Sequence, residues 1–146
     1  MTGASEIRRS RTIDLDPPTL YRILRLRAEV FVVEQDCVFN DLDGRDLEPS
    51  TEQCWIEQDG DVVATLRVIV EPDASRRIGR VAVRASFRRR GFAAALMRAA
   101  LDIAGDQAVV LDAQSHLLGW YERLGFVVDG TDFIEDGIPH TPMRRA

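Results

Sequence analysis

The sequence predicts an α/β fold in which helices cover a sheet of mixed strand direction. Three observations carry this prediction. A short apolar strand pattern at 81–83 runs into an amphipathic helix pattern that begins at Ala93. An Asp-Gly pair at 59–60 joins two strand patterns as a hairpin. A second buried strand pattern, at 108–113, follows the helix, so that strands precede and follow it along the chain.

The length and composition are those of one globular domain over residues 1–146, with the polar segment 1–10 expected to be flexible. The net charge of −5 argues against a nucleic-acid partner, because such partners favour basic surfaces. No apolar run has transmembrane length and no signal-peptide pattern opens the chain, so we expect a cytoplasmic protein without membrane association. Cys37 and Cys54 lack the spacing of a zinc site or disulfide scaffold, and no metal is expected.

The first half of the chain is expected to contain a strand, a helix and a long loop. The strand lies at 11–15, and Asp16 before two prolines then predicts a helix that continues to about residue 33. The last part of this helix, VFVVEQ, is rich in β-branched residues and is expected to leave regular α geometry. The loop at 36–51 is long for a connection in a compact domain, which indicates a functional role.

The second half is expected to alternate strands and helices, and a proline falls in its last strand. Pro142 cannot donate a backbone hydrogen bond, so the sequence predicts an edge position for it. The expected elements are strands at 53–58, 62–71 and 78–83, a helix from 93 to 104, a strand at 108–113, a short helix at 117–124 ended by Gly125, and strands at 126–128, 133–135 and 140–145.

Small residues bare the first turn of the central helix. Gly91 and Ala93 leave its free N–H groups unshielded, and the positive end of the helix dipole lies there, so this turn can hold an anion. Arg88, Arg89 and Arg90 add positive charge at the same place. The segment lacks the GK[ST] of a Walker A loop and the GxGxxG of a Rossmann fold. A nucleotide, a phosphosugar or coenzyme A would each suit such a phosphate site.

The stretch Arg88-x-x-Gly91-x-Ala93 after a strand resembles the acyl-CoA-binding motif Q/R-x-x-G-x-G/A of the GNAT N-acetyltransferase superfamily. WYERLGF, at 120–126, is similar to the Y-x-x-x-G-F block of that superfamily. Three further blocks resemble its ElaA-like family: RAEVFVVEQDC with DLDGRDL, then LDAQSHL, then EDGIPHTPM. The resemblance implies a GNAT fold, with a central sheet splayed to form the acyl-CoA slot. It also implies an N-acetyltransferase that moves an acetyl group from acetyl-CoA to a primary amine by direct attack.

The resemblance further implies which residues bind the donor. Backbone N–H groups from Arg89 to Ala93 would hold the pyrophosphate, with the Arg88 and Arg89 side chains near phosphate. Val81 and Val83 would pair with the pantetheine arm, and the N–H of Val83 would serve the acyl oxygen. The full set of donor-binding residues is Val81, Ala82, Val83, Arg88, Arg89, Arg90, Gly91, Phe92, Ala93 and Gln114.

Four residues are candidates for proton transfer. By resemblance Tyr121 is the general acid for the departing thiolate, since a tyrosine pKa of about 10 suits a thiol pKa of about 8.5. Glu34, His116 and His140 are candidate bases, with Glu34 favoured because it borders the acidic loop. Each also has a structural interpretation: core packing for Tyr121, an ion pair with an arginine for Glu34, and local ordering of a helix start or a turn for the two histidines.

Acidic residues gather in two segments expected beside the slot: Asp36, Asp41, Asp43, Asp46, Glu135 and Asp136. They predict a cationic acceptor, such as a polyamine, an aminoglycoside-like molecule or a lysine side chain; a solvated loop is the alternative. Two rival functions stay open. One is a coenzyme A-binding sensor or interaction module without efficient catalysis, and the other an acyltransferase that uses a longer acyl chain or an acyl carrier protein. The sequence leaves the oligomeric state open, a homodimer included.

Overall fold

The computed structural model describes residues 6–146, whose strands form one mixed sheet. The strands are β1 (Ile7–Arg11), β2 (Glu52–Gln58), β3 (Asp61–Val70), β4 (Arg76–Val83), β5 (Val109–Gln114), β6 (Val127–Val128), β7 (Phe133–Glu135) and β8 (Ile138–Arg145). Their order is β1-β2-β3-β4-β5-β8-β6, with β7 paired to β8. Only the β4–β5 pair is parallel among these strands, which confirms the α/β class with mixed strand direction.

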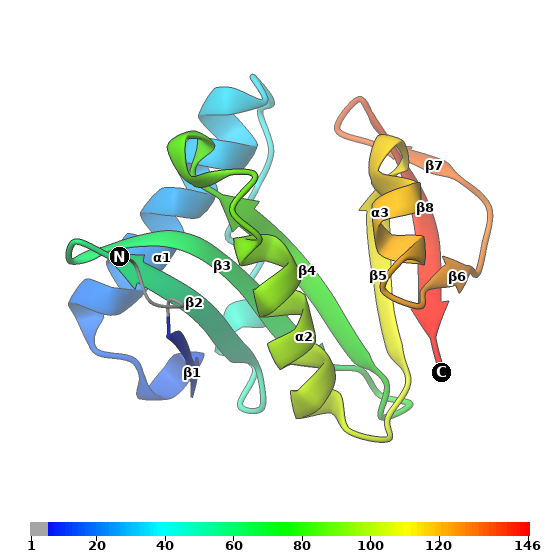
Figure 1. Cartoon of the computed structure of the whole chain (residues 1–146), viewed down its shortest axis with the longest axis horizontal. Coiled ribbons are helices and arrows are strands. Elements are labelled where there is room, and N and C mark those ends of the chain that lie inside the picture. The colour runs from blue at the N-terminus through cyan, green and yellow to red at the C-terminus, as the bar shows by residue number, and fades with distance from the viewer. Residues whose placement is uncertain (1–5) are drawn as a thin grey trace.

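Helices lie on both faces of this sheet, with α2 in front of it and α1 behind it in Figure 1. The helices are α1 (Pro17–Ala28), α2 (Phe92–Ala104) and α3 (Leu118–Glu122), with a π-helical segment at Glu29–Glu34 and short 3-10 turns at Thr12–Asp14, Arg45–Leu47, Ala85–Phe87 and Ser115–Leu117. On one face, Leu96 and Met97 of α2 belong to the larger core cluster. On the other, Ile23 and Leu26 of α1 form a smaller cluster. The sheet therefore separates an α2 side from an α1 side.

Local sequence signals account for several element ends. Asp16 caps α1 by accepting hydrogen bonds from the N–H and the hydroxyl of Thr19, at 3.2 and 2.8 Å. The helix then passes into the π-helical segment Glu29–Glu34, so the expected departure from α geometry is confirmed. Asp59 and Gly60, both with left-handed φ, form the two-residue turn between β2 and β3, as the Asp-Gly pair predicted.

The structure corrects two expectations. The first strand lies at Ile7–Arg11 rather than at 11–15, and it pairs with β2, so part of the segment expected to be flexible is strand. Residues 1–5 fall outside the described chain. Pro142 is not in an edge strand, because β8 has β5 on one side and β6 and β7 on the other. Pairing with β7 ends at His140 and pairing with β6 begins at Met143, so the missing N–H faces the gap between these two short strands.

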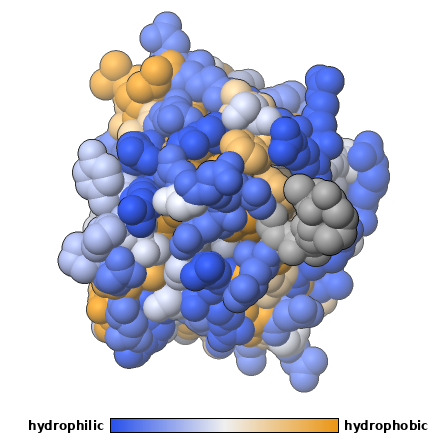
Figure 2. All heavy atoms as spheres, turned by 60° about the vertical axis from the view of Figure 1, so that its left-hand side comes forward, coloured by the Kyte–Doolittle hydropathy of each residue, from blue (hydrophilic) through white to orange (hydrophobic). Residues whose placement is uncertain are grey.

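The surface agrees with this layering. Figure 2 views the molecule from the side that lies to the left in Figure 1, and the surface there is mostly hydrophilic, with hydrophobic residues in separate patches. Such a surface is expected where most apolar side chains are already packed against the sheet. No helix within residues 6–146 is long and apolar enough to cross a membrane.

Candidate active site

The sheet opens between its two central strands. β4 and β5 pair only at Arg76 with Val109 and at Arg77 with Val110, close to the start of both strands. Beyond these two pairs the strands diverge, as Figure 1 shows. A cavity of about 620 Å³ lies there, lined by residues from β4, β5, the start of α2, the π-helical segment after α1, and α3. The splayed sheet implied by the resemblance is therefore present.

A bulge interrupts β4 beside this cavity. Gly79 lies opposite Arg67 of β3, whereas Ala82 lies opposite Thr65. Three steps along β4 thus match two steps along β3, so β4 contains one extra residue. Arg80, within the bulge, has a φ of 53°, in the left-handed region that residues other than glycine rarely adopt.

The bulge decides which backbone groups face the cavity. The N–H of Arg76 donates to Ala108 O, toward β5, but the N–H of Arg84 donates to Val63 O, toward β3, each at 2.8 Å. Groups eight residues apart point to the same side of a regular strand, so the extra residue has reversed the alternation. The N–H of Val83, next to Arg84, consequently points away from β3 and toward the cavity, where the acyl oxygen was expected to find a donor.

The turn before α2 is shaped as the anion site requires. Arg89 and Gly91 both have left-handed φ, 64° and 80°, and a Cβ on Gly91 would meet nothing within 4 Å. From Arg89 onward in the described chain, Ala95 is the first residue whose N–H finds a backbone acceptor, the carbonyl of Gly91 at 3.0 Å. The N–H groups at 89–94 are left free, and Gly91 and Ala93 line the cavity.

The three arginines of this turn have three different environments. Arg88 forms a two-pronged ion pair with Glu34, at 2.5 and 2.7 Å, and its Nε donates to the carbonyl of Val83 at 3.0 Å. Arg90 lies over the ring of Phe87, 4.9 Å from its centroid. Arg89 lines the cavity, is exposed, and has no ion-pair partner among residues 6–146. Of the three side chains, that of Arg89 lines the cavity without an ion-pair partner, whereas that of Arg88 lines it while paired with Glu34.

This ion pair changes the interpretation of Glu34. The hydrogen bonds from Arg88 hold the pKa of Glu34 below its ordinary value, so the carboxylate stays ionised and engaged. Glu34 does not line the cavity. The structural alternative, an ion pair with an arginine, describes this residue, and the preference for Glu34 as base is set aside.

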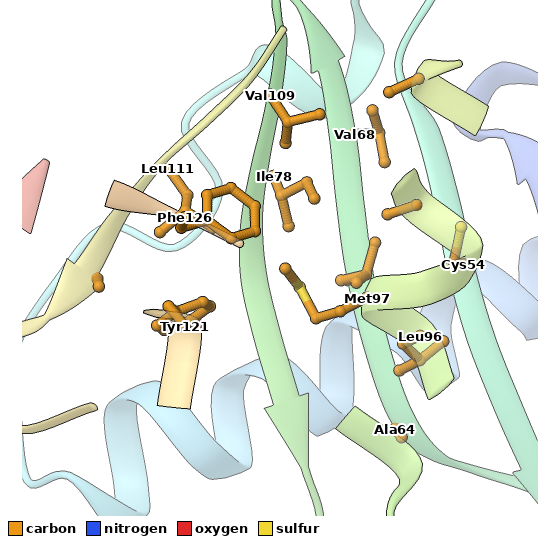
Figure 3. Close-up of a cluster of buried hydrophobic side chains, with 14 of the residues drawn as sticks. Cys54, Ala64, Val68, Ile78, Leu96, Met97, Val109, Leu111, Tyr121 and Phe126 are labelled. Atoms are coloured by element: carbon orange, nitrogen blue, oxygen red, sulfur yellow. The ribbon is translucent and has the colours of Figure 1, made fainter. Parts of the chain in front are cut away.

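Tyr121 lines the cavity from α3 and is only 8% exposed. Figure 3 shows it beside Phe126 and Leu111, in the core cluster on the α2 side. Its hydroxyl has no hydrogen-bond partner among residues 6–146. Burial raises the pKa of Tyr121 to about 12, so the expected match with a thiol pKa does not hold inside the protein. Tyr121 is a neutral hydrogen-bond donor at any physiological pH.

His140 also lines the cavity, and it lies opposite Gln114 where β8 pairs with β5. Its Nδ1 is 2.8 Å from the carbonyl oxygen of Ile138, and its ring stacks on Phe133 with centroids 5.5 Å apart. A carbonyl oxygen can only accept, so a neutral imidazole here carries its proton on Nδ1 and keeps Nε2 as an acceptor. His116, in contrast, is exposed and does not line the cavity.

The two cavity residues His140 and Tyr121 lie on opposite sides of the sheet. Leu111 and Ala113 of β5 belong to the α2-side cluster, as does Tyr121. Gln114 alternates with Ala113 and faces the α1 side, and the side chain of His140, directly opposite Gln114, shares that face. The arrangement thus offers a proton acceptor on one side of the slot and a proton donor on the other.

The acidic loop is mostly not a substrate surface. Arg27 of α1, 1% exposed, donates to Asp41 at 3.0 Å and to Asp46 at 2.8 and 3.1 Å. Arg67 of β3 binds Asp43 at 2.6 Å, which holds the pKa of Asp43 far below its ordinary value. These three aspartates are thus neutralised within the protein, contrary to the expectation that they attract a cationic acceptor.

Of the expected acidic residues, Glu135 and Asp136 line the cavity, at the hairpin between β7 and β8. Asp36 is exposed, and its two neighbours in the chain line the cavity. The carbonyl of Asp136 accepts a hydrogen bond from the thiol of Cys37 at 3.3 Å. This contact joins the 36–51 loop to the hairpin across the slot. The acidic rim is therefore smaller than predicted.

Three arginines that hold this loop were not predicted from the sequence: Arg27, Arg67 and Arg80. A signal for two of them was available. Arg27 interrupts the apolar stripe of α1, between Leu26 and Val30, and Arg67 interrupts the apolar run of β3. A cation at a position that the pattern buries requires a buried anion, and the aspartates of the next loop were the natural partners.

Comparisons with known proteins agree with this geometry. A family model described as "Acetyltransferase (GNAT) domain" matches residues 28–146. A UPF0039 protein of Mycobacterium tuberculosis is 46% identical over 143 residues, which is 95% of this chain and 92% of that protein. Protein ElaA of Escherichia coli is 36% identical over 138 residues, 90% of either chain.

Solved structures give the same result. An acyl-CoA N-acyltransferase from Pseudomonas aeruginosa has a TM-score of 0.93 and 39% identity, covering 98% of this chain and 100% of that one. The crystal structure of Escherichia coli ElaA has a TM-score of 0.91 and 33% identity, covering 97% and 99%. With its splayed strands, bared helix start and free strand edge, the chain belongs to the GNAT acetyltransferases, a family of acyltransferases, and within them to the ElaA-like proteins.

Proposed function

We propose that the protein transfers an acetyl group from acetyl-CoA to the primary amine of a small cationic molecule or peptide. The observation that carries this proposal is the cavity between β4 and β5. Free N–H groups at 89–94 line one end of this cavity and can bind a pyrophosphate. The N–H of Val83 faces the cavity, and His140 lies on the side of the sheet opposite Tyr121. An acyl-CoA that lies in this slot would have its thioester carbon between His140, which faces the amine acceptor, and Tyr121, which faces the departing sulfur.

The residues suit direct transfer. His140 Nε2 accepts a proton from the acceptor's ammonium group, directly or through water, which frees the nitrogen lone pair. The nitrogen then forms a bond to the thioester carbon while the C–S bond breaks, and the Val83 N–H stabilises the charge that develops on the acyl oxygen. Tyr121 donates a hydrogen bond to the departing sulfur. The surplus proton of the attacking nitrogen passes to this thiolate, directly or through Tyr121 or water, so the products are a neutral amide and the coenzyme A thiol.

His140→Gln is expected to lower kcat for amine acetylation by about 10- to 100-fold, because a positioned base contributes about 10²- to 10⁴-fold and water replaces it in part. Its matched control is His116→Gln, which changes an exposed histidine outside the cavity and should leave kcat within about twofold. Initial rates for the two variants at saturating acetyl-CoA decide the assignment. Equal loss in both variants, or in neither, would remove His140 as the base.

The cationic acceptor is supported by Glu135 and Asp136, which line the cavity and form no ion pair among residues 6–146. Neutralising both, with Glu135→Gln and Asp136→Asn, is expected to raise KM for a dicationic amine by about two- to tenfold, since exposed charge pairs contribute about 0.2–1 kcal/mol each. KM for a monocation should rise less, and added salt should reduce the difference. Asp102→Asn with Asp106→Asn, on the exposed end of α2 and the turn after it, is the control pair.

A panel of amines tests the proposed function as a whole, with release of free coenzyme A thiol as the measurement. Polyamines, aminoglycosides and lysine peptides are compared with neutral and anionic amines. Faster turnover of the cations is the expected result. Preference for neutral or anionic acceptors would contradict the proposal that Glu135 and Asp136 attract a cationic acceptor. Tight binding of acetyl-CoA without turnover of any amine would instead favour the sensor alternative. Competition by longer acyl-CoA donors or acyl carrier protein would expose a different donor.

A further inference from the structure

Arg80 adopts a backbone conformation that an arginine does not choose on its own. Its φ of 53° lies in the left-handed region, which costs free energy for a residue with a Cβ, and it occurs inside a strand rather than at a turn. Such a conformation persists only where surrounding contacts enforce it. Contacts of the Arg80 side chain must therefore hold this residue in the bulge.

The contacts all come from one short piece of the 36–51 loop. Arg80 Nε lies 2.8 Å from Asp41 Oδ1, and Nη2 donates to the carbonyl oxygen of Asp41 at 3.1 Å and to Asp43 Oδ2 at 3.4 Å. The guanidinium also lies over the ring of Phe39, 4.8 Å from its centroid. The side chain is 19% exposed.

The loop itself is fixed to the rest of the fold. Arg27 binds Asp41 from α1, and Arg67 binds Asp43 from β3, next to the bulge. The Arg80 side chain is thus held between two aspartates that cannot move freely. Because the carboxylates of Asp41 and Asp43 lie against its guanidinium, Arg80 is poorly suited to bind an anionic substrate group, although it lines the cavity.

We propose that Arg80 is a positioning residue: residues 39–43 hold its side chain and thereby lock the β4 bulge in the register that presents the Val83 N–H to the acyl oxygen. The reversed alternation between Arg76 and Arg84 exists only while the extra residue stays at the bulge. This inference rests on the proposed function, since it concerns the thioester of that reaction. It gives the acidic loop a role in the active site that does not involve the acceptor.

The test compares three variants with the wild type. Arg80→Gly removes the held side chain while glycine accepts the left-handed φ without strain, so the bulge is permitted but no longer held. Arg80→Lys keeps a cation for the two aspartates and loses the planar fork over Phe39. Ala74→Gly is the matched backbone control, because Ala74 has a φ of 72° in the turn before β4, away from the cavity.

Two readouts are used: steady-state kinetics, and the ¹³C resonance of acetyl-CoA labelled at its carbonyl carbon, free and bound. In the wild type the bound resonance should move from its free position, as a polarised carbonyl does. In Arg80→Gly we expect more than half of that movement to disappear and kcat to fall by about 10- to 100-fold, part of the roughly 10²- to 10³-fold that one such donor supplies. KM for acetyl-CoA should stay within about twofold. Arg80→Lys should lie between, and Ala74→Gly should match the wild type.

An unchanged kcat and carbonyl resonance in Arg80→Gly would overturn the proposal, as would a wild-type carbonyl that does not move on binding. A general rise in KM with an intact carbonyl signal would point to a merely structural role and also overturn it. If Arg80→Gly does not fold, the Lys variant decides by the same readouts. Failure of the proposed function is separate: no amine would then be acetylated, yet the carbonyl movement in the wild type and its loss in the Arg80 variants would still be observed.

Discussion

Gly91→Asp is expected to reduce the affinity for coenzyme A by about 10³-fold. An aspartate there must adopt a φ of 80° and would place a carboxylate where the free N–H groups at 89–94 converge. Two unit charges about 4 Å apart near a protein surface repel by about 4 kcal/mol, which corresponds to almost three powers of ten. Titration calorimetry with coenzyme A measures the loss directly.

The control separates charge at the site from backbone strain. Gly60, in the turn between β2 and β3, has a similar φ of 78° and open space around its Cα. Gly60→Asp therefore carries the same strain and the same charge away from the cavity, and should bind coenzyme A as the wild type does. Undiminished affinity in Gly91→Asp would refute the assignment of this turn to the pyrophosphate.

Tyr121→Phe should lower kcat by about 100-fold while KM for acetyl-CoA changes little. The hydroxyl is the one polar group of this side chain, it has no partner among residues 6–146, and phenylalanine fills the same space between Trp120 and Phe126. Loss of a positioned proton donor is a transition-state effect, so it appears in kcat rather than in KM. Stopped-time assays of thiol release at saturating substrates give both constants.

The pH dependence adds a second check on Tyr121. With a pKa of about 12, its hydroxyl remains protonated up to about pH 10, so Tyr121 cannot cause an alkaline loss of activity that begins near neutral pH. Tyr21→Phe, on the exposed surface of α1, is the matched control and should be silent. Equal kcat in wild type and Tyr121→Phe would exclude Tyr121 from the reaction.

Local signals predicted most of the fold. The Asp-Gly turn, the proline-marked start of α1 and the β-branched π-helical segment each depend on a few neighbouring residues, and each lies where expected. The first strand was predicted too far along the chain. The residues at 7–11 look alike as an edge strand or as a polar tail, and only the pairing with β2 distinguishes the two. The edge position predicted for Pro142 was wrong because the gap that accommodates this proline depends on how β6 and β7 both pair with β8, which the sequence does not reveal.

In the site, too, local features could be predicted from the sequence and contacts between distant residues could not. The anion turn is local, so Gly91 and Ala93 could be assigned from the order of strand, turn and helix. The roles of charged residues could not, because an ion pair joins positions far apart in the chain: Glu34 with Arg88, or Asp43 with Arg67. The two histidines were likewise equivalent in sequence, and only the pairing of β8 with β5 brings His140 into the cavity.

The short β4–β5 pairing has a consequence for how the protein holds together. Past Arg77 and Val110, the facing edges of β4 and β5 do not pair with each other, so backbone N–H and C=O groups along them lack ladder partners. A donor whose pantetheine arm pairs with these edges would act as an additional strand that completes the sheet. Stability would then follow donor concentration, rising by about 2.7 kcal/mol at a hundred times the dissociation constant. Substrate supply would in this way set the lifetime of the folded enzyme as well as its rate.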